Sequence, residues 1–481
     1  MNFMIPSFAP AVPEMVLLAL ASFILIADTF WSKRFQAATY WATQATLLVV
    51  GYLILVSFST EQVITFNGSF VRDAFADVMK LFTVLTMFGV LMFSREYIKQ
   101  HDFYSGEFFV LALFGVLGMF VMISAHNMIT MYIGLEILAL ASIAMIALRK
   151  DSGEAVEAAM KYFVLGALAT GMLLYGFSMI YGATGSISFP EISKVIAQGN
   201  ANSTVLAFGV VFVVIGLAFK MGAVPFHMWV PDVYHGSPTA VTLFIGTAPK
   251  LAYFAMVYRI LEEALPGLVK DWQELIIMVA VLSLFVGAVV AIAQDNLKRM
   301  LAYSGIGHIG FMLLGVIAAT PEGFAASMFY MIVYAVTAVA GFGIIVALSR
   351  KGFEFDKIAD FAGLNSRNPW LAFMMLIIMF SMAGIPPFIG FWAKIIVIEE
   401  VIKAGFTWLA VVAVITAVIS AYYYLKVVKA IYFDKPTDDS PVTTTTFSAN
   451  VVLSLTALAL LIVGLTPNWL IDLSYRSLTA L

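Results

Sequence analysis

The sequence has 481 residues, of which 62% are hydrophobic and 11% are charged, and its formal net charge is −3. Soluble domains are nearer half apolar and a quarter charged, so this composition predicts an integral membrane protein and argues against a nucleic-acid partner. The sequence contains no cysteine, which excludes disulfides, thiolate metal sites, cysteine-ligated iron–sulfur clusters and cysteine nucleophiles within the chain.

Apolar runs long enough to cross a bilayer recur along the whole sequence and predict fourteen transmembrane helices. The first seven cover 11–31, 37–58, 74–94, 107–124, 127–148, 157–182 and 204–229. The second seven cover 237–261, 273–293, 298–318, 322–348, 370–397, 406–432 and 448–471. The ten-residue alternation of a membrane barrel is not found, so the predicted class is an all-α integral membrane protein.

The positive charges of the connecting loops are unequally distributed. The loops after odd-numbered helices carry Lys33, Arg34, Arg95, Lys99, Arg149, Lys150, Lys298, Arg299, Arg350, Lys351, Lys357, Arg367 and Lys435. The opposite side carries Arg72, Lys194, Lys270, Lys403 and Arg476. Because cytoplasmic loops are enriched in lysine and arginine, the odd-to-even loops are predicted to be cytoplasmic and both termini to face outward.

Two of the predicted helices carry a similar interruption. In helix 7 the apolar run reaches Lys220 and then breaks at GAVPFHMW, whereas in helix 12 it breaks at AGIPPFIGFW and Lys394 follows. Paired Pro/Gly-interrupted spans are typical of transporters built from repeats. The interruptions lie five helices apart, which predicts that helices 7 and 12 are discontinuous and belong to inverted five-helix repeats. The predicted domains are 1–106 (helices 1–3), 107–261 (helices 4–8), 273–432 (helices 9–13) and 448–481 (helix 14).

Five ionisable side chains stand well inside the apolar runs, near the middle of a predicted span, namely Glu136, Lys220, Lys250, His308 and Lys394. A charged residue at mid-membrane costs roughly 2.5–3.5 kcal/mol on insertion scales, so each needs a partner, water or a function. Burial in general lowers the pKa of a lysine, and a nearby carboxylate raises it again, so a moving charge can switch a buried lysine between holding and releasing a proton. Glu136 is the deep carboxylate of the first predicted repeat and is therefore the expected partner of Lys220. The set indicates proton transfer.

Each of these residues also has a structural interpretation. Glu136 and Lys220 can form a buried ion pair without another role, and Lys250, which follows a proline, can satisfy a carbonyl freed by a helix kink. His308 can form a hydrogen bond across a close helix contact. Lys394 can extend towards the outer interface, as long cationic side chains do near helix ends.

Other polar residues are secondary candidates. Asp232, in or after the second half of helix 7, is interpreted first as a structural anchor and second as a gate for proton entry. Lys161 on helix 6 can extend the chain of groups toward Lys220. The run Tyr422–Tyr424 is interpreted as part of an interfacial aromatic belt, with a proton exit as the alternative. The sequence carries no phosphate-binding loop, dinucleotide fingerprint, metal-ligand spacing or catalytic triad. The energy for transport is therefore expected to come from outside the chain.

Four stretches carry a family resemblance, namely GLEILALA, KMGAVPFHMWVPDVYHGSP, NLKRMLAYSGIGHIG and SMAGIPPFIGFWAK. Through helices 4–13 the sequence resembles the antiporter-like subunits of proton-pumping NADH:quinone oxidoreductase, respiratory complex I. Among these it is most similar to the N type, because it ends soon after helix 14 and carries Lys394 on helix 12. The resemblance implies proton-translocating roles for the helix 5 glutamate (Glu136), the central lysine (Lys220), the bridging lysine (Lys250), a histidine of the polar chain between the halves (His308) and the helix 12 lysine (Lys394).

The resemblance also implies a setting for the chain. It would be a multi-pass subunit of a bacterial inner membrane, bound to other membrane-arm subunits, including neighbouring antiporter-like ones, and driven by quinone reduction elsewhere. No cofactor is expected in this chain, because flavin, iron–sulfur clusters and quinone would belong to partner subunits. Two further interpretations stay open: a subunit of a multi-subunit sodium/proton antiporter, and a passive membrane scaffold.

Overall fold

The computed structural model describes residues 6–31, 36–101, 106–436 and 445–479; Lys33 and Arg34, two of the loop charges used above, lie outside these ranges. Within them, thirteen helical segments are long and apolar enough to cross a membrane, and the predicted all-α membrane fold is confirmed. The N-terminal part comprises α1 (Val12–Phe30), α2 (Gln36–Val56), the hairpin β1 (Val63–Thr65) and β2 (Phe70–Arg72), and α3 (Ala74–Gln100).

The middle and last parts of the chain are almost wholly helical. The helices of the first half are α4 (Gly106–Ile123), α5 (Met128–Ile146), α6 (Gly153–Thr184), α7 (Phe189–Ala197), α8 (Ser203–Met221), α9 (Trp229–Gly236), α10 (Thr239–Ile245) and α11 (Ala248–Tyr258). Those of the second half are α12 (Val269–Ile292), α13 (Leu297–Ile317), α14 (Pro321–Leu348), α15 (Leu364–Arg367), α16 (Pro369–Ala383), α17 (Ile389–Lys403), α18 (Thr407–Tyr432), α19 (Phe447–Leu465) and α20 (Asn468–Thr479).

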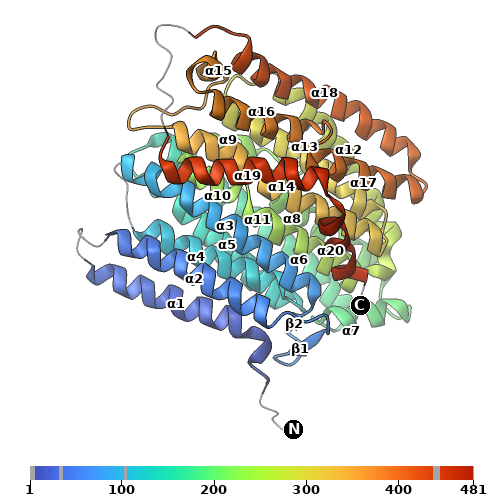
Figure 1. The fold of residues 1–481 in the computed structure, drawn as a ribbon. Helices are drawn as coiled ribbons and strands as arrows, with labels where there is room; N and C mark the ends of the chain where they lie inside the picture. The colour runs from blue at the N-terminus through green and yellow to red at the C-terminus, as the bar shows by residue number, and fades with distance from the viewer. Residues whose placement is uncertain (1–5, 32–35, 102–105, 437–444, 480–481) are drawn as a thin grey trace.

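The helices run side by side as one bundle, with α10, α11 and α14 at its centre (Figure 1). The hairpin, α7 and α20 lie together at one end, where α1 also begins (Figure 1). α14 packs against α13, α17 and α16 of its own half, and also against α3, α10, α11 and α19. It therefore joins the two halves of the molecule to the N-terminal and C-terminal helices.

The predicted helices 7 and 12 are both discontinuous. Helix 7 consists of α8 and α9, and α9 lies almost wholly beyond the predicted end at 229. Helix 12 consists of α16 and α17, and α17 continues past the predicted end at 397. The first segment of each pair ends at a left-handed glycine, Gly222 with φ 77° and Gly384 with φ 83°. A Cβ atom at Gly222 would lie 2.5 Å from Val230, and one at Gly384 would lie 2.8 Å from the Lys394 side chain. Glycine is required here by both the backbone conformation and the space.

The predicted helix 8, over 237–261, is also interrupted, and this interruption was not predicted. α10 ends at Ile245 and α11 begins at Ala248, with Thr247 between them at φ −122° and ψ −96°. Pro249 stands in the first turn of α11, where its missing N–H leaves no intrahelical bond unmade and its fixed φ suits the helix. Pro249 thus starts a new helix segment rather than kinking a continuous one.

A polar cluster at the other end of the bundle connects α3, α10 and the loop after α14. The Glu354 carboxylate accepts hydrogen bonds from the Tyr97 hydroxyl and, at 2.8 Å, from Thr239 Oγ1, and it lies 3.4 Å from His101 Nε2. Burial alone would raise the pKa of Glu354, but nearby Lys298 and the two hydroxyl donors together hold it below its usual range. The native fold therefore stabilises the ionised form of Glu354.

Replacement of Glu354 by alanine is expected to destabilise the bundle by about 1.5–3 kcal/mol at neutral pH, the usual contribution of hydrogen bonds to a charged group. Because the folded pKa is lowered, this contribution is present above the unfolded value of about 4.3 and is lost as the pH falls through the folded value. The temperature at which the purified protein loses its native state measures the effect. Glu191→Ala, at a carboxylate that is 57% exposed, is the control, and an equal loss in both variants would contradict the assignment.

Candidate functional site

A small cavity in the first half is lined by both Glu136 of α5 and Lys220 of α8. Tyr162 and Thr170 of α6 complete its polar lining, and its volume is about 40 Å³. A cavity needs roughly 10–15 Å³ on this measure to hold a water molecule, so two or three can be accommodated. No salt bridge joins Glu136 to Lys220 in the described part of the chain, and Lys220, which is 3% exposed, forms no hydrogen bond there. The ammonium faces the cavity, not a fixed partner.

Lys250 lies directly beside the break in helix 7. It is buried, and its Nζ donates a 2.6 Å hydrogen bond to the Met221 carbonyl, the last of α8. The Nζ also lies 5.8 Å from the centre of the Trp229 ring, whose own Nε1 donates to the Phe219 carbonyl. Lys250 thus satisfies a free carbonyl, but the interpretation of a kink in its own helix is wrong, because the carbonyl is the last of α8.

Lys394 takes the same position at the break in helix 12. Its Nζ donates to the Met382 carbonyl at 3.0 Å and to the Ala383 carbonyl at 2.8 Å, both at the end of α16. The side chain is buried, so the interpretation that it extends to the outer interface is wrong. A cation at a helix C-terminus is favoured by the helix dipole and by charge-assisted hydrogen bonds. In its contacts Lys394 therefore corresponds to Lys250. The position of Lys220, two residues before Gly222, corresponds to Met382, two residues before Gly384.

His308 is held between two tyrosines in the second half. Its Nδ1 lies 2.6 Å from the Tyr330 hydroxyl and its Nε2 lies 3.1 Å from the Tyr424 hydroxyl, which is 2.5 Å from Ser304 Oγ. Tyr330 was not predicted as a site residue, and Tyr424 was considered only as the alternative to an aromatic belt. They lie on α14 and α18, and no local sequence pattern shows that these helices meet α13 at His308.

A second cavity lies between His308 and the break in helix 12. Its volume is about 10 Å³, room for about one water molecule. It is lined by His308, Tyr330, Val333, Tyr334, Thr337, Ser381, Met382, Gly390 and Ala393. The described part of each half thus places a lysine-bearing break next to a small cavity whose lining includes polar side chains.

The secondary candidates lie apart from these cavities. Asp232 of α9 forms salt bridges with Lys161 of α6 at 2.8 Å and with Arg299 of α13 at 3.1 Å. The Asp232 and Lys161 side chains are 38% and 40% exposed, and Lys161 does not line the cavity of Lys220. This geometry supports the structural interpretation of Asp232 as an anchor between helices. Arg299 completes the anchor and was not predicted to take part.

The tyrosine run of α18 divides between two environments. Tyr422 is 60% exposed, as the aromatic-belt interpretation predicts, whereas Tyr423 and Tyr424 are buried. The belt interpretation is therefore wrong for Tyr423 and Tyr424. Tyr424 instead belongs to the hydrogen-bonded chain of His308.

The comparison with known proteins identifies the family of this chain. Residues 125–420 match the family model described as NADH:quinone oxidoreductase/Mrp antiporter, transmembrane. The chain is 68% identical over 478 residues to NADH-quinone oxidoreductase subunit N of Hydrogenovibrio crunogenus, covering 99% of this chain and 100% of that protein. It is 51% identical over 475 residues to the subunit N of Thioalkalivibrio sulfidiphilus, covering 98% and 99%. The chain belongs to the N subunits of NADH-quinone oxidoreductase.

Solved structures include similar chains from respiratory complex I and from an Mrp complex. A chain of respiratory complex I from Thermus thermophilus with bound aureothin is 29% identical, with a TM-score of 0.83, covering 96% of this chain and 100% of that one. A chain of the Mrp complex from Dietzia sp. DQ12-45-1b has a TM-score of 0.84 at 21% identity, covering 98% and 97%. At that identity the Mrp similarity shows the fold alone.

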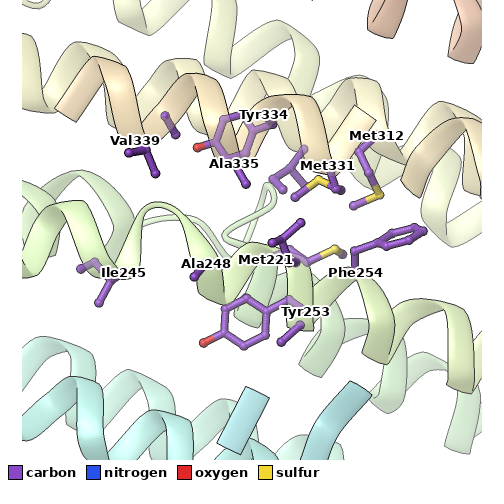
Figure 2. Close-up of a cluster of buried hydrophobic side chains, with 14 of the residues drawn as sticks. Met221, Ile245, Ala248, Tyr253, Phe254, Met312, Met331, Tyr334, Ala335 and Val339 are labelled. Atoms are coloured by element: carbon purple, nitrogen blue, oxygen red, sulfur yellow. The ribbon is translucent and has the colours of Figure 1, made fainter. Parts of the chain in front are cut away.

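The two halves of this N subunit meet through an apolar cluster. Figure 2 shows Met221, Ala248 and Phe254 opposite Met312, Met331 and Ala335, with Tyr253 and Tyr334 as the labelled polar side chains. Except for these tyrosines, the labelled side chains offer no hydrogen-bonding group to carry a proton between Lys250 and His308. The resemblance implied a polar chain between the halves, and at this point the described packing is apolar.

Proposed function

We propose that this N subunit translocates protons across the membrane, driven by quinone reduction in other subunits of the NADH:quinone oxidoreductase. The observation that carries the proposal is the pairing, in each half, of a broken helix, a buried lysine and a cavity large enough for water. The proposed carriers are Glu136, Lys220, Lys250, His308 and Lys394. Lys161 and Asp232 act as a structural anchor for α9.

In the first half, Glu136 and Lys220 exchange protons through water in their shared cavity. Because Glu136 and Lys220 form no direct ion pair in the described structure, the Lys220 ammonium is not held by a fixed partner, and its proton can move. At low effective dielectric, a change of charge on Glu136 strongly alters the free energy of protonated Lys220. A conformational or charge change in a neighbouring subunit can thus reach Lys220 through Glu136, which is half-buried.

In the second half, His308 passes protons between the Tyr424–Ser304 chain and the cavity beside Lys394. The imidazole has one ring nitrogen against each tyrosine hydroxyl, so it can accept a proton at one nitrogen and release one at the other. The apolar cluster between Lys250 and His308 then acts as the barrier between the halves. Protons cross it only when water enters among the flexible methionine side chains.

The energy for transport comes from partner subunits. Moving one proton against 100 mV requires about 2.3 kcal/mol, and the proposal assigns flavin, iron–sulfur clusters and quinone to those partners. The odd-to-even loops are proposed to be cytoplasmic and both termini periplasmic. The partners include other membrane-arm subunits and neighbouring antiporter-like subunits.

The Glu136→Gln variant tests the proposal. The complex containing it is expected to translocate fewer protons per NADH in proteoliposomes, because glutamine keeps the shape of glutamate but carries no exchangeable charge. NADH oxidation with a soluble artificial acceptor is expected to stay unchanged. Glu107→Gln, at an exposed carboxylate in the first turn of α4, is the control. An unchanged proton-to-NADH ratio in Glu136→Gln would remove Glu136 from the pathway.

The sodium/proton antiporter is the second candidate, because its family shares the matching model and the fold. Replacing sodium by potassium on both sides of the proteoliposome separates the two functions. The proposed proton translocation is expected to be the same in both media. A requirement for sodium would favour the antiporter.

A further inference from the structure

An aromatic ring lies against the lysine at each helix break. In helix 7 the Lys250 Nζ lies 5.8 Å from the centre of the Trp229 ring. In helix 12 the Lys394 Nζ lies 5.1 Å from the centre of the Phe311 ring. Within the described residues, the other polar contacts of both lysines are backbone carbonyls at the end of a helix. Each ammonium there is therefore stabilised by carbonyl oxygens and a ring, and not by a carboxylate.

The two rings do not come from corresponding positions of the two breaks. Trp229 begins α9, the segment after the break in helix 7, whereas Phe311 lies on α13. The tryptophan of the second break, Trp392, donates its Nε1 to the Gly464 carbonyl of α19 instead. A ring beside the lysine is therefore not a simple copy of a repeated motif. Its recurrence from a different element indicates a physical requirement that the two breaks share.

A ring face suits a lysine that must both hold and release a proton. The ring attracts the ammonium through its quadrupole, most strongly for tryptophan and where water is excluded. A carbonyl oxygen likewise binds a charged donor more strongly than a neutral one. A carboxylate at the same place would favour the charged form further and hold it in an ion pair. The carbonyl and the ring therefore stabilise the ammonium without locking it.

Each ring also packs on a tyrosine that lines the cavity of its half. The Trp229 and Tyr162 ring centres lie 4.8 Å apart, and Tyr162 lines the cavity of the first half. The Phe311 and Tyr330 ring centres lie 6.1 Å apart with planes at 12°, and Tyr330 lines the cavity of the second half. Each ring thus contacts both a lysine and a residue of a cavity wall, which fixes the position of the ammonium relative to that wall.

The orientation of the Trp229 ring is set by its own N–H. Its Nε1 donates to the Phe219 carbonyl at 3.0 Å, and Lys250 donates to the Met221 carbonyl at 2.6 Å. These two carbonyls belong to the residues on either side of Lys220. The indole is buried, with 3% of the residue exposed. Trp229 and Lys250 are therefore attached side by side to the same turn of α8.

We propose that Trp229 and Phe311 are positioning residues for proton transfer, and that each holds the protonated form of its neighbouring lysine, Lys250 or Lys394, at the helix end without an ion pair. This role rests on the proposed function, because it acts through two of the proposed carriers. A weaker negative charge on the ring face leaves the ammonium less stabilised, so the step that protonates the lysine slows. A ring that only fills space has no such effect.

Tryptophans with one to four ring fluorines, incorporated at position 229 alone, test the role of Trp229. Fluorine withdraws charge from the ring face but keeps the shape of the ring and its N–H. Coupled NADH:quinone turnover of the complex in proteoliposomes is expected to fall progressively along the series, by roughly tenfold at four fluorines, the effect of losing a desolvated cation–π contact. The same series at Trp408, which is 52% exposed on α18, is expected to change nothing.

Phenylalanines with one to three ring fluorines test Phe311 in the same assay, with Phe285, which is 57% exposed on α12, as the control. Unchanged turnover along the series at either position would overturn the role of that ring. The variants Lys250→Met and Lys394→Met, measured alongside, separate this failure from that of the proposed function. If they lose turnover while both series stay level, the carriers stand and the positioning role falls. If either keeps full turnover, that lysine is not a carrier, and the role of its ring falls with it.

Discussion

Lys220→Met is expected to abolish proton transfer through the first half while leaving the fold intact or more stable. The Lys220 ammonium is buried and has no hydrogen-bond partner within the described residues, and a lysine at the centre of a membrane helix costs about 2.5–3.5 kcal/mol. Methionine removes this cost and already occupies the matching position, Met382, before the break in helix 12. Loss of an essential proton carrier slows its step roughly 10²-fold or more.

Two measurements on the purified complex separate a proton carrier from a structural lysine. Protons translocated per NADH, or coupled NADH:quinone turnover, are expected to fall in Lys220→Met, whereas subunit content and thermal stability are expected to be kept. Lys194→Met, at a lysine that is 63% exposed on α7, is expected to match the wild type in both. If Lys220→Met lowers assembly as much as it lowers pumping, the passive-scaffold interpretation is the better one.

The membrane spans and their breaks could be predicted from the sequence because the bilayer restricts the backbone so strongly. A chain in hydrocarbon must satisfy its peptide groups within helices, so apolar length and Gly/Pro position define the spans. This reasoning located both discontinuous helices. It failed where the deciding feature was local geometry. Helix 8 breaks at Thr247, next to a glycine that keeps an ordinary helical conformation, Gly246 with φ −81°. Pro467 separates α19 from a short α20 that the predicted span 448–471 merged.

The candidate site was only partly predictable, because its partners come from distant parts of the chain. Apolar context was enough to find the five proposed carriers, of which the three lysines are buried. It could not show that Lys250 caps a carbonyl 29 residues away, or that His308 meets a hydroxyl 116 residues away. In the run Tyr422–Tyr424, successive residues rotate by about 100° around the helix, so which tyrosines face inward depends on how α18 packs.

The contacts of Lys394 lead to a different expectation from that for Lys220. Lys394→Met is expected to lower both proton translocation and stability, because it removes the donor that satisfies the Met382 and Ala383 carbonyls at the end of α16. An unsatisfied buried carbonyl costs about 1–3 kcal/mol. The loss of pumping in this variant alone would therefore not distinguish a proton carrier from a helix cap.

Lys394→Gln separates the two roles. The glutamine amide can still donate a hydrogen bond toward the α16 carbonyls, yet it cannot take up and release a proton near neutral pH. We expect the thermal stability of the complex to recover partly from Lys394→Met to Lys394→Gln, while protons translocated per NADH stay at the low value of Lys394→Met. Lys429→Met, at a lysine of α18 that is 67% exposed, controls for loss of a positive charge. Recovery of pumping together with stability in Lys394→Gln would show that Lys394 acts only as a cap, and the outward step would then have to pass from His308 through another group.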